Sequence, residues 1–511
     1  MFENQPKGLF ALALANTGER FGYYTMLAVF ALFLRANYGL DAGWAGEIYS
    51  DFLMLVYFLP VVGGWLADKF GFGRMVTIGI LIMFAGYLLL SVPLGGDTLA
   101  LVVMLAALVL IGLGTGLFKG NLQVMVGDLY NDPKYASQRD SGFSIFYMAI
   151  NIGALFAPTA AVRIMEWAQQ NLGTSVNDSY HFAFAVACAS LILSIAIYYI
   201  FRSTFRHVEG GKKMEGVKKF GAEELSKEET SQRIVALCLV FAVVIFFWMA
   251  FHQNGLSLTY FADEFTAKTS TGIEGMAFSV WNLVAIIFIV YALFSLFQSK
   301  TSKGKAISFA VIVIAVVFLF FQYDATKGEI VAVSAPIFQQ FNPFYVVALT
   351  PVSLAIFGTL SAKGKEPSAP RKIAYGMVVA GLAYCLMAVA SFGLPMPQTT
   401  MGADGEPVAV HVADVTPQLL IYTYLILTFA ELLLSPMGIS FVSKVAPPKY
   451  KGLMMGGWFV ATAIGNKLVG VGGYLWGNIP LWAVWSVFIA LCLISAIFMF
   501  SMMKKLEAAT E

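Results

Sequence analysis

The chain has 511 residues, of which 59% are hydrophobic and only 12% are charged, about half the charged share of an ordinary soluble domain. These proportions argue against a soluble enzyme. The charged residues cluster between apolar runs of bilayer-spanning length, so the sequence predicts an all-α membrane protein whose surroundings are a lipid bilayer. The net charge is only +2, and no basic patch is interleaved with aromatic residues, which argues against nucleic acid as a partner.

The four cysteines do not predict a disulfide framework or a metal site. Cys188, Cys238, Cys385 and Cys492 all lie inside apolar segments, where cysteine is typically a small core residue. The first apolar run follows Lys7 without a charged leader and a small-residue cleavage site. We therefore expect no cleaved signal, and the first helix would be its own insertion signal.

Windows of about 20 mainly apolar residues predict fourteen transmembrane helices. Six precede the longest charged segment, at 9–34, 44–66, 75–93, 98–124, 141–165 and 181–201. Eight follow it, at 233–254, 276–298, 306–322, 343–361, 372–392, 417–441, 452–474 and 481–503.

The positions of lysine and arginine predict the orientation. If the amino terminus is cytoplasmic, most basic residues fall in inside segments, and those in outside segments are Arg35, Arg163, Lys268 and Lys327. Because cytoplasmic loops carry the excess of Lys and Arg, both termini are predicted to be cytoplasmic.

The charged segment 202–232 divides the chain after six predicted helices. A charge run of this kind is typically solvated, with at most a short surface helix over 223–229. Two halves around a central crevice are a common construction of transporters. We therefore predict an amino-terminal domain at 1–201, a cytoplasmic linker at 202–232 and a carboxyl-terminal domain at 233–511.

Ionisable residues inside the predicted spans are the first candidates for function. A charge at the centre of a bilayer costs about 2.5–3.5 kcal/mol on insertion scales, so such residues are rare without a role. Asn16, Glu19, Arg20 and Tyr23 are spaced i, i+3, i+4 and i+7, which places them on one face of the first helix. That face is predicted to line an interior cavity.

Lys119 and Glu431 are further charges within predicted spans. Glycines precede Lys119 in the run GLGTGLFKGN and permit close helix approach, and the lysine then needs an anionic partner. Glu431 is followed by Ser435 and by Pro436, which loosens the helical hydrogen-bond ladder. A proton, a membrane cation or a cationic group of a substrate could neutralise this glutamate.

Other polar residues in the predicted spans could have either a functional or a structural role. His252, at the end of the seventh span, could titrate near physiological pH or could be a neutral histidine bonded between helices. Tyr147 and Asn151 lie one turn apart and could bond either a polar guest or a neighbouring helix. Asp51 and Lys467 lie nearer the outer ends of their spans, which favours structural roles.

The run GGWLADKFGFGR, at 63–74, joins the second and third spans. Its glycines allow a tight turn, and Asp68 could cap a helix start while pairing with Arg74 or Lys69. We interpret this run as a hinge or gate latch.

The sequence resembles the proton-dependent oligopeptide transporters of the major facilitator superfamily over nearly its whole length. The family signature ExxERFxYY corresponds to Asn16–Tyr24, and FYxxINxG corresponds to Phe146–Gly153. The remaining matches are the fourth-span lysine Lys119, the FW at Phe247–Trp248, the NP at Asn342–Pro343, the ExxxSP at Glu431–Pro436, Trp458, and the superfamily loop motif at Gly64–Arg74.

The resemblance implies a site for a proton and a peptide. Glu19, Arg20 and Lys119 would form an ion-pair cluster, in which protonation of Glu19 frees the basic groups to hold the peptide carboxylate. Glu431 would hold the amino terminus of the peptide. Other residues expected to line the cavity are Tyr23, Tyr24, Tyr57, Asn151, Trp248, Asn342, Ser435 and Trp458.

Three residues depart from the family pattern. Asn16 replaces the first glutamate of the signature, Leu27 stands where many bacterial members have a second arginine, and His252 occupies a position that is often acidic. We hypothesise that proton coupling is redistributed, with Glu19 as the principal site and His252 or Glu431 as the second.

The extra helix pair also departs from the family pattern. Many bacterial members insert two helices between the six-helix halves, whereas here the extra pair, at about 276–322, follows the seventh span. It carries no intramembrane charge, which suggests a peripheral, lipid-facing hairpin rather than a transport role.

We therefore predict a major facilitator fold with two six-helix bundles plus a hairpin, acting as a monomeric symporter for di- and tripeptides in a bacterial inner membrane. The proton would be the coupling ion, and no cofactor or metal is expected. The alternative on the same fold is a transporter of amino acids, peptide-like drugs or another small anion. An intramembrane enzyme lacks an HExxH or GxSxG motif here, and a channel lacks a repeated filter motif.

Overall fold

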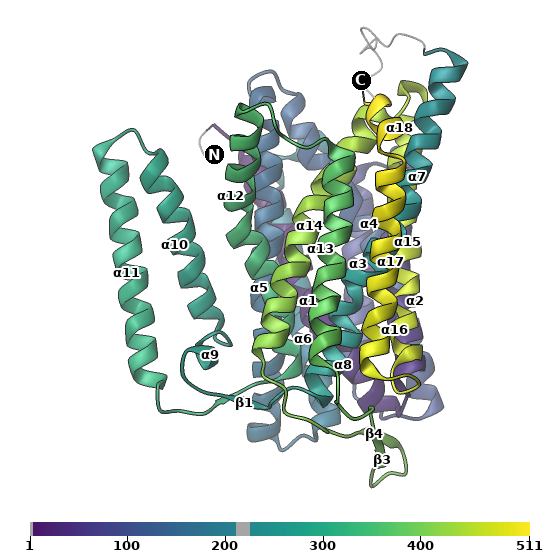
Figure 1. Ribbon diagram of the computed structural model, residues 1–511, viewed down its shortest axis with the longest axis vertical. Coiled ribbons are helices and arrows are strands. Elements are labelled where there is room, and N and C mark those ends of the chain that lie inside the picture. The colour runs from purple at the N-terminus through teal and green to yellow at the C-terminus, as the bar shows by residue number, and fades with distance from the viewer. Residues whose placement is uncertain (1–3, 211–224, 511) are drawn as a thin grey trace.

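The computed structural model describes residues 4–210 and 225–510, and it is almost entirely helical (Figure 1). Its described part contains fourteen helices of 18 or more residues, in the order of the fourteen predicted spans. These are α1 (Lys7–Tyr38), α2 (Ala42–Phe70), α3 (Phe72–Ser91), α4 (Thr98–Asp128), α5 (Arg139–Leu172), α6 (Val176–Ile200), α7 (Lys227–Phe251), α10 (Val280–Gln298), α11 (Ser302–Thr326), α12 (Phe341–Ala362), α13 (Ala369–Ala390), α14 (Gln418–Val445), α15 (Lys451–Leu468) and α17 (Leu481–Ser501).

Shorter elements connect the long helices. The short α-helices are α8 (Ser257–Glu264), α9 (Gly272–Met276), α16 (Gly470–Leu475) and α18 (Met503–Ala508). The 3₁₀ helices are η1 (Leu129–Asn131), η2 (Ala136–Gln138), η3 (Arg202–Thr204), η4 (Arg206–Val208), η5 (His252–Gly255), η6 (Ala335–Gln340) and η7 (Pro448–Tyr450). Two antiparallel strand pairs, β1 (Thr269–Ser270) with β2 (Val331–Ala332) and β3 (Thr399–Met401) with β4 (Pro407–Ala409), lie at the end opposite the chain termini.

Twelve helices of the described chain are long and apolar enough to cross a membrane. The long helices outside this group are α1 and α15, which carry charged residues such as Arg20 and Lys467 within otherwise apolar sequences. A helix with charged residues is stable in a membrane protein when neighbouring helices separate those residues from lipid. α1 packs against α5 and α6, and α15 packs between α2 and α7.

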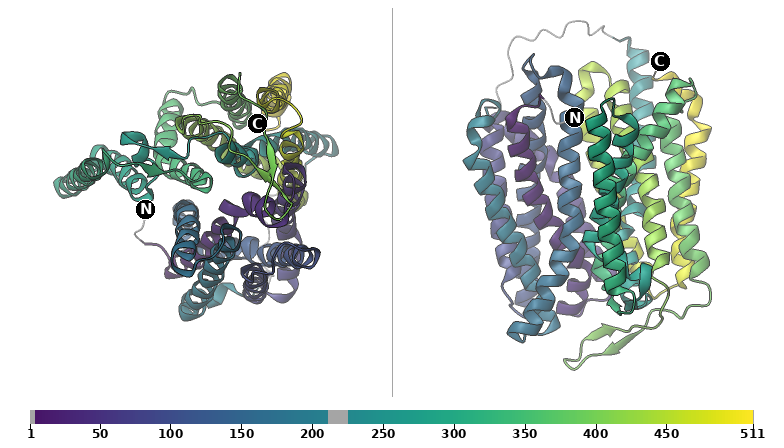
Figure 2. Two further views of the ribbon diagram at one scale, coloured as in Figure 1. Left: turned by 90° about the horizontal axis from the view of Figure 1, so that it is seen from below. Right: turned by 90° about the vertical axis from the view of Figure 1, so that its left-hand side faces the viewer.

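The long helices form two groups. α1 to α6 pack on one another, and α7, α12, α13, α14, α15 and α17 form the second group (Figure 2). α10 and α11 stand apart as a hairpin at one side (Figure 1), as the sequence predicts for the extra pair. The Tyr291 hydroxyl of α10 donates to the Val347 carbonyl of α12 at 2.9 Å and ties the hairpin to the second group.

Two predicted helices are interrupted. The seventh span continues beyond α7 through η5 and α8, and the backbone leaves helical geometry at Leu256, where φ is −117° and ψ is −87°. The predicted helix 452–474 breaks at Val469 into α15 and α16. The first break follows the polar run 252–255, where the predicted span also ends, whereas the apolar pattern continues through the break at Val469 and gives no sign of it.

The predicted linker is partly structured. α7 begins at Lys227, earlier than predicted, because Ser226 and Glu229 form a capping box that stabilises a charged first turn. At the other end, Glu209 accepts two hydrogen bonds from Arg202 at 2.8 and 2.7 Å, and its carbonyl accepts from Gly73 N at 3.2 Å. This contact docks the segment on α3, whereas 211–224 lies outside the described residues.

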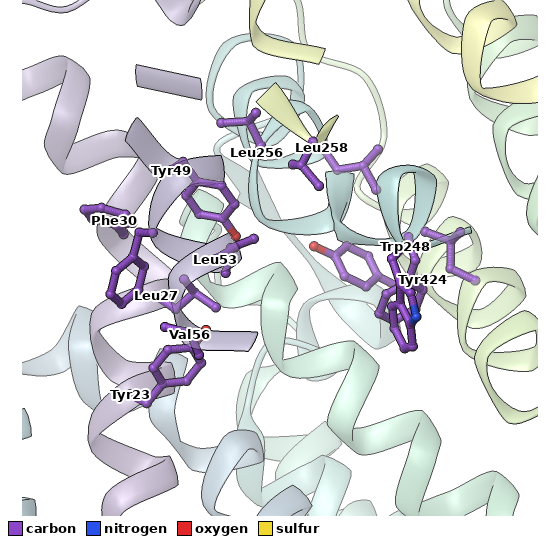
Figure 3. Close-up of a cluster of buried hydrophobic side chains, with 14 of the residues drawn as sticks. Tyr23, Leu27, Phe30, Tyr49, Leu53, Val56, Trp248, Leu256, Leu258 and Tyr424 are labelled. Carbon is purple, nitrogen blue, oxygen red and sulfur yellow. The ribbon is translucent and has the colours of Figure 1, made fainter. Parts of the chain in front are cut away.

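Glycines set the closest helix approaches. A Cβ on Gly63 would lie 2.0 Å from the carbonyl oxygen of Gly116, so α2 and α4 can meet here only without side chains. Between the two groups, Gly46 of α2 and Gly473 of α16 approach in the same way, with a Cβ contact of 3.1 Å. The core extends across the junction, where aromatic and aliphatic side chains of α1 and α2 face Trp248, Leu256, Leu258 and Tyr424 (Figure 3).

Candidate functional site

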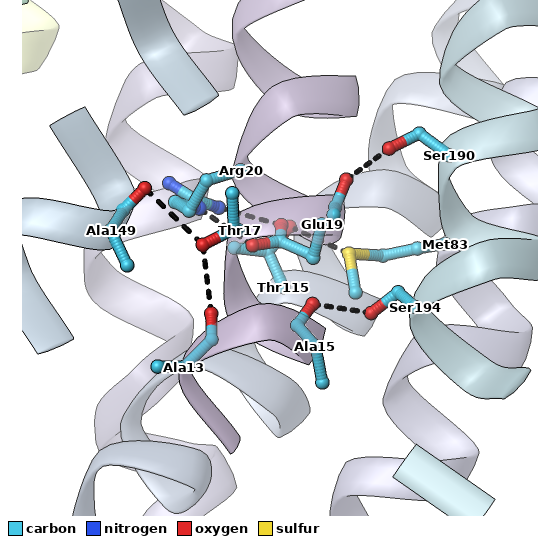
Figure 4. Close-up of polar contacts among 11 residues, drawn as sticks. Ala13, Ala15, Thr17, Glu19, Arg20, Met83, Thr115, Ala149, Ser190 and Ser194 are labelled. Atoms are coloured by element: carbon cyan, nitrogen blue, oxygen red, sulfur yellow. Dashed lines mark hydrogen bonds and ion pairs between the residues drawn. The ribbon is translucent and has the colours of Figure 1, made fainter. Parts of the chain in front are cut away.

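Glu19 and Arg20 form a buried ion pair on α1. The guanidinium donates through Nε and Nη2 to the two carboxylate oxygens at 2.6 and 2.7 Å, and the exposed fractions of the two residues are 0% and 1% (Figure 4). Arg20 also lies over the Tyr23 ring, 4.3 Å from its centroid. The remaining guanidinium nitrogen, Nη1, has no hydrogen-bond partner among the described residues. Nη1 of Arg20 can therefore donate a hydrogen bond to a further acceptor, such as a ligand.

The helix that carries this pair is held on both sides. The Thr17 hydroxyl donates to the Ala149 carbonyl of α5 at 3.2 Å, and the Ser194 hydroxyl of α6 donates to the Ala15 carbonyl at 2.5 Å (Figure 4). Ser190 of α6 donates to the carbonyl of Gly18. These bonds fix the position of α1, so a change in the ion pair would occur in the side chains rather than by movement of the helix.

Lys119 lies near Tyr57 instead of near an acid. Its Nζ is 4.2 Å from the centroid of the Tyr57 ring, which is a cation–π geometry. Among the described residues, no carboxylate lies within ion-pair distance of Lys119, and Glu19 pairs only with Arg20. The predicted three-residue ion-pair cluster is therefore not formed in this conformation. Lys119 is half-buried and has no ionic partner among the described residues.

Aromatic rings continue from Lys119 across the junction of the two helix groups. The Tyr57 and His252 rings lie 6.1 Å apart, and Trp248 stacks on His252 at 5.2 Å. His252 Nδ1 and Asn466 Oδ1 of α15 are 2.5 Å apart, so the histidine bonds a neighbouring helix, one of the two predicted readings. The indole N–H of Trp248 has no partner among the described residues.

Glu431 lies on α14 and has an amide as its partner. Asn342 Nδ2 of α12 donates to the Glu431 carboxylate at 2.8 Å and to the Thr428 hydroxyl at 3.1 Å. In the described part of the chain, no lysine, arginine or histidine pairs with Glu431. The residue is half-buried, so this carboxyl group also keeps an accessible face.

The other predicted lining residues differ in their surroundings. Trp458 is buried over Gly438, where a Cβ would contact its ring at 2.0 Å. Asn151 is half-buried and donates to the Tyr147 carbonyl of its own helix at 3.0 Å. The hydroxyl of Tyr147 accepts from Gln123 of α4. Tyr24 and Ser435 are half-buried.

Taken together, these side chains come from central helices of both groups and lie in one interior region between the groups. Some are half-buried, and others, such as Arg20, Trp248 and Trp458, are buried. The α1–α4 side of this region carries the unpaired charge of Lys119 and the free donor of Arg20. Its α14 side carries the carboxylate of Glu431. Among the described residues, no group of three or more His, Cys, Asp and Glu side chains is placed to hold a metal ion.

The sequence profile of the POT family matches residues 73–220 and 316–475, which is more than half of the 511 residues. The chain belongs to the POT family. Among its relatives, the uncharacterised transporter YclF of Bacillus subtilis is 29% identical over 502 residues, covering 94% of this chain and 90% of that protein. A di-/tripeptide transporter of Lactococcus lactis is 27% identical, with 91% and 89% covered.

A solved structure shares the fold. The crystal structure of a peptide transporter POT in complex with sulfate superimposes with a TM-score of 0.73 at 24% identity, covering 100% of this chain and 96% of that chain. As a member of the POT family, the chain is a membrane transporter and not an enzyme, and the solved structure shares its fold.

The contacts that join the two groups in this POT-family chain gather at the end opposite the termini. Lys467 of α15 forms ion pairs with Glu47 and Asp51 of α2. Arg35 pairs with Glu264 at 3.2 Å, and the Trp476 indole N–H donates to the same carboxylate at 3.0 Å. The structure is therefore closed at this end.

Sequence reasoning missed part of this closure. It singled out Asp51 and Lys467 separately but not Glu47 or Glu264. The i, i+4 spacing of Glu47 and Asp51 places two carboxylates on one helix face, and that spacing was the available signal. The Asp51–Lys467 contact agrees with the structural roles expected for both residues.

The loop motif differs from the expectation. Asp68 lies in the last turn of α2 and is exposed, and the residue before α3 is Gly71, which makes no side-chain cap. Asp68 forms no ion pair with Arg74 or Lys69 in the described part of the chain, and Lys69 instead lies over the Trp65 ring at 3.8 Å. The prediction of Asp68 as a cap is wrong, because the positive φ of 95° at Gly71 ends one helix and starts the next without a side-chain oxygen.

Proposed function

We propose that this chain imports di- and tripeptides together with protons by alternating access. The observation that carries the proposal is the separation of unpaired charges around one interior, with Lys119 on one side and Glu431 on the other. A zwitterionic peptide has a carboxylate for the first and an ammonium for the second. Because uncompensated charges in a membrane interior are costly, a ligand that pairs both explains their retention.

Substrate orientation follows from this charge layout. The peptide carboxylate would bind Lys119 and the free Nη1 of Arg20, and the peptide ammonium would bind Glu431. Complementary potentials fix the direction of a ligand without reading its side chains. The indole N–H of Trp248 is a further buried donor available to a peptide carbonyl.

Proton coupling would use the Glu19–Arg20 pair. While Glu19 is ionised, it occupies two of the guanidinium N–H directions of Arg20. Protonation of Glu19 would weaken this bidentate bond and release Arg20 toward the peptide carboxylate. Release of the peptide and of the proton on the other side would restore the pair. His252 and Glu431 are the proposed second proton sites.

The orientation and architecture are also part of the proposal. Positive-inside counting places both termini in the cytoplasm, so the end closed by Lys467 and Glu264 is the outer end and the conformation faces inward. The proposed domains are 1–201 and 233–511, joined by 202–232, with gating at the Asp68–Arg74 loop. We propose a monomer in a bacterial inner membrane that uses the proton as its coupling ion without a cofactor.

The remaining lining residues, Tyr23, Tyr24, Tyr57, Asn151, Asn342, Ser435 and Trp458, complete the proposed binding site. Asn342 has a second role as the residue that orients Glu431. The departures at Asn16 and Leu27 leave carboxylate binding to Arg20 and Lys119.

Counterflow in liposomes tests the substrate class. Protein-loaded vesicles containing an unlabelled dipeptide should take up labelled dipeptide, and Lys119→Gln should abolish this exchange while Lys505→Gln, at an exposed site, should not. If free amino acids exchange as fast as dipeptides do, the alternative function is favoured, which is transport of amino acids, peptide-like drugs or another small anion. Absence of dipeptide exchange in the wild type would refute the proposal.

A further inference from the structure

A cavity lies outside the proposed transport site, at the base of the α10–α11 hairpin. It has a volume of about 480 Å³ and is lined from α5, from the start of α10 and from the end of α11. Its polar lining residues are Thr159, Arg163, Glu166, Ser279, Asn282, Gln322, Thr326 and Ser334. Figure 1 shows this part of the hairpin beside α9 and β1, at the end of the molecule opposite the termini.

Asn282 contributes an unpaired acceptor to this cavity. The residue is 5% exposed, and its Nδ2 donates to the Met276 carbonyl at 2.9 Å. Its Oδ1 is buried and has no hydrogen-bond partner among the described residues. Because buried polar atoms in native proteins are nearly always bonded, this oxygen calls for a donor from outside the chain.

A charge pair stands at the same cavity. Arg163 and Glu166 lie one turn apart on α5, and their nearest atoms are 3.5 Å apart. The side chains are 79% and 40% exposed, so both charges can reach a ligand. The cavity therefore offers a cation for a phosphate, and a carboxylate with an amide oxygen for an ammonium group.

The surroundings of the cavity are apolar. Trp281 also lines it, is 61% exposed and contacts the Phe156 ring of α5 at 5.5 Å. Along α11, large side chains such as Phe320 and Phe321 are more than half exposed. Such a surface is stable only against acyl chains, so a ligand that reaches the cavity along the hairpin comes from the bilayer.

We propose that this cavity binds the headgroup of a phospholipid that carries a primary ammonium, with the phosphate at Arg163 and the ammonium between Glu166 and the Oδ1 of Asn282. The acyl chains lie along the exposed apolar side chains of the hairpin. The lining includes α5 of the first helix group and Ile337 of η6 in the second, so the lipid bridges the two groups at the closed end.

Native mass spectrometry of the purified full-length protein tests this site. The probes are phosphatidylethanolamine and phosphatidylcholine, whose trimethylated ammonium cannot donate hydrogen bonds. We expect tighter retention of phosphatidylethanolamine by the wild type. Arg163→Gln and Asn282→Leu should each weaken its retention about tenfold, which corresponds to about 1.4 kcal/mol. The matched control is Lys268→Gln, which removes an exposed ion-paired cation at the same end but outside the cavity.

Several results would overturn the proposal. Equal retention of both lipids, or unchanged retention in Arg163→Gln, would mean that lipids coat the hairpin without a headgroup site. Competition by soluble phosphoethanolamine as strong as that by the lipid would identify a small-ligand site instead. Because Arg163 is exposed, Arg163→Gln should fold. Its lipid retention therefore tests the headgroup site even if Asn282→Leu does not fold.

Discussion

Replacement of Lys467 by methionine should open the closed end of the transporter. The ammonium group bonds both Glu47 and Asp51 across the two helix groups, and the exposed fractions of these side chains are 33%, 29% and 46%. Partly exposed ion pairs contribute about 0.2–1 kcal/mol each, so the two together contribute about 0.4–2 kcal/mol to closure. Without the lysine, the two carboxylates also repel each other from positions one turn apart.

This free-energy difference sets the ratio of the closed and outward-open conformations. A change of about 1.4 kcal/mol shifts a two-state equilibrium about tenfold toward the outward-open form. Spin labels on Val176 of α6 and Trp482 of α17, which are exposed side chains of the two groups, would report the change as a longer interlabel distance in pulsed electron paramagnetic resonance.

The matched control is Lys327→Met, which breaks an exposed ion pair with Asp324 inside the hairpin and joins no helix groups. It should leave the distance distribution unchanged. If Lys467→Met has the wild-type distribution as well, the ion pairs do not set the closed conformation and the reasoning is refuted.

Three further predictions concern the binding site, the packing and the pH dependence. Glu431→Gln should strongly reduce uptake of dipeptides with a free amino terminus but spare residual uptake of N-acetylated ones; equal loss for both would contradict the assigned contact. Gly63→Ala places a Cβ 2.0 Å from a backbone oxygen of α4, so overpacking should cost about 1–3 kcal/mol in thermal unfolding. Gly64→Ala meets no atom within 4 Å and should be tolerated; equal melting temperatures would refute the close approach. Arg371 holds the pKa of Glu507 below its ordinary value of 4.5, so the stabilisation is present above that value and is lost as the pH falls through the lowered pKa. Glu507→Gln should therefore lower the melting temperature at neutral pH but not in acid, and a similar loss at both would count against the pair.

The sequence predicted the helices well because the bilayer imposes a length and a composition on each of them. It also predicted that Glu19, Arg20, Lys119 and Glu431 would be unusual, because ionised groups within apolar runs are costly wherever they lie. Without the family resemblance, spacing along the chain alone could not place these residues relative to one another.

The pairing of these charges could not be predicted. Glu19 had two possible ion-pair partners, Arg20 and Lys119. Side-chain conformation, rather than spacing along the helix, determines that Glu19 bonds Arg20 and that Lys119 lies over the Tyr57 ring. The break at Val469 was also hidden, because an apolar run does not record where the helical hydrogen-bond ladder is interrupted.

The most direct test of the central claim is pH-gradient-driven accumulation of a labelled dipeptide in liposomes, measured for the wild type and for Glu19→Gln. The variant should keep peptide exchange, because Arg20 is released permanently, and should lose accumulation, because no proton is bound and returned at this site. Accumulation by Glu19→Gln at the wild-type level would contradict the role of the Glu19–Arg20 pair in coupling.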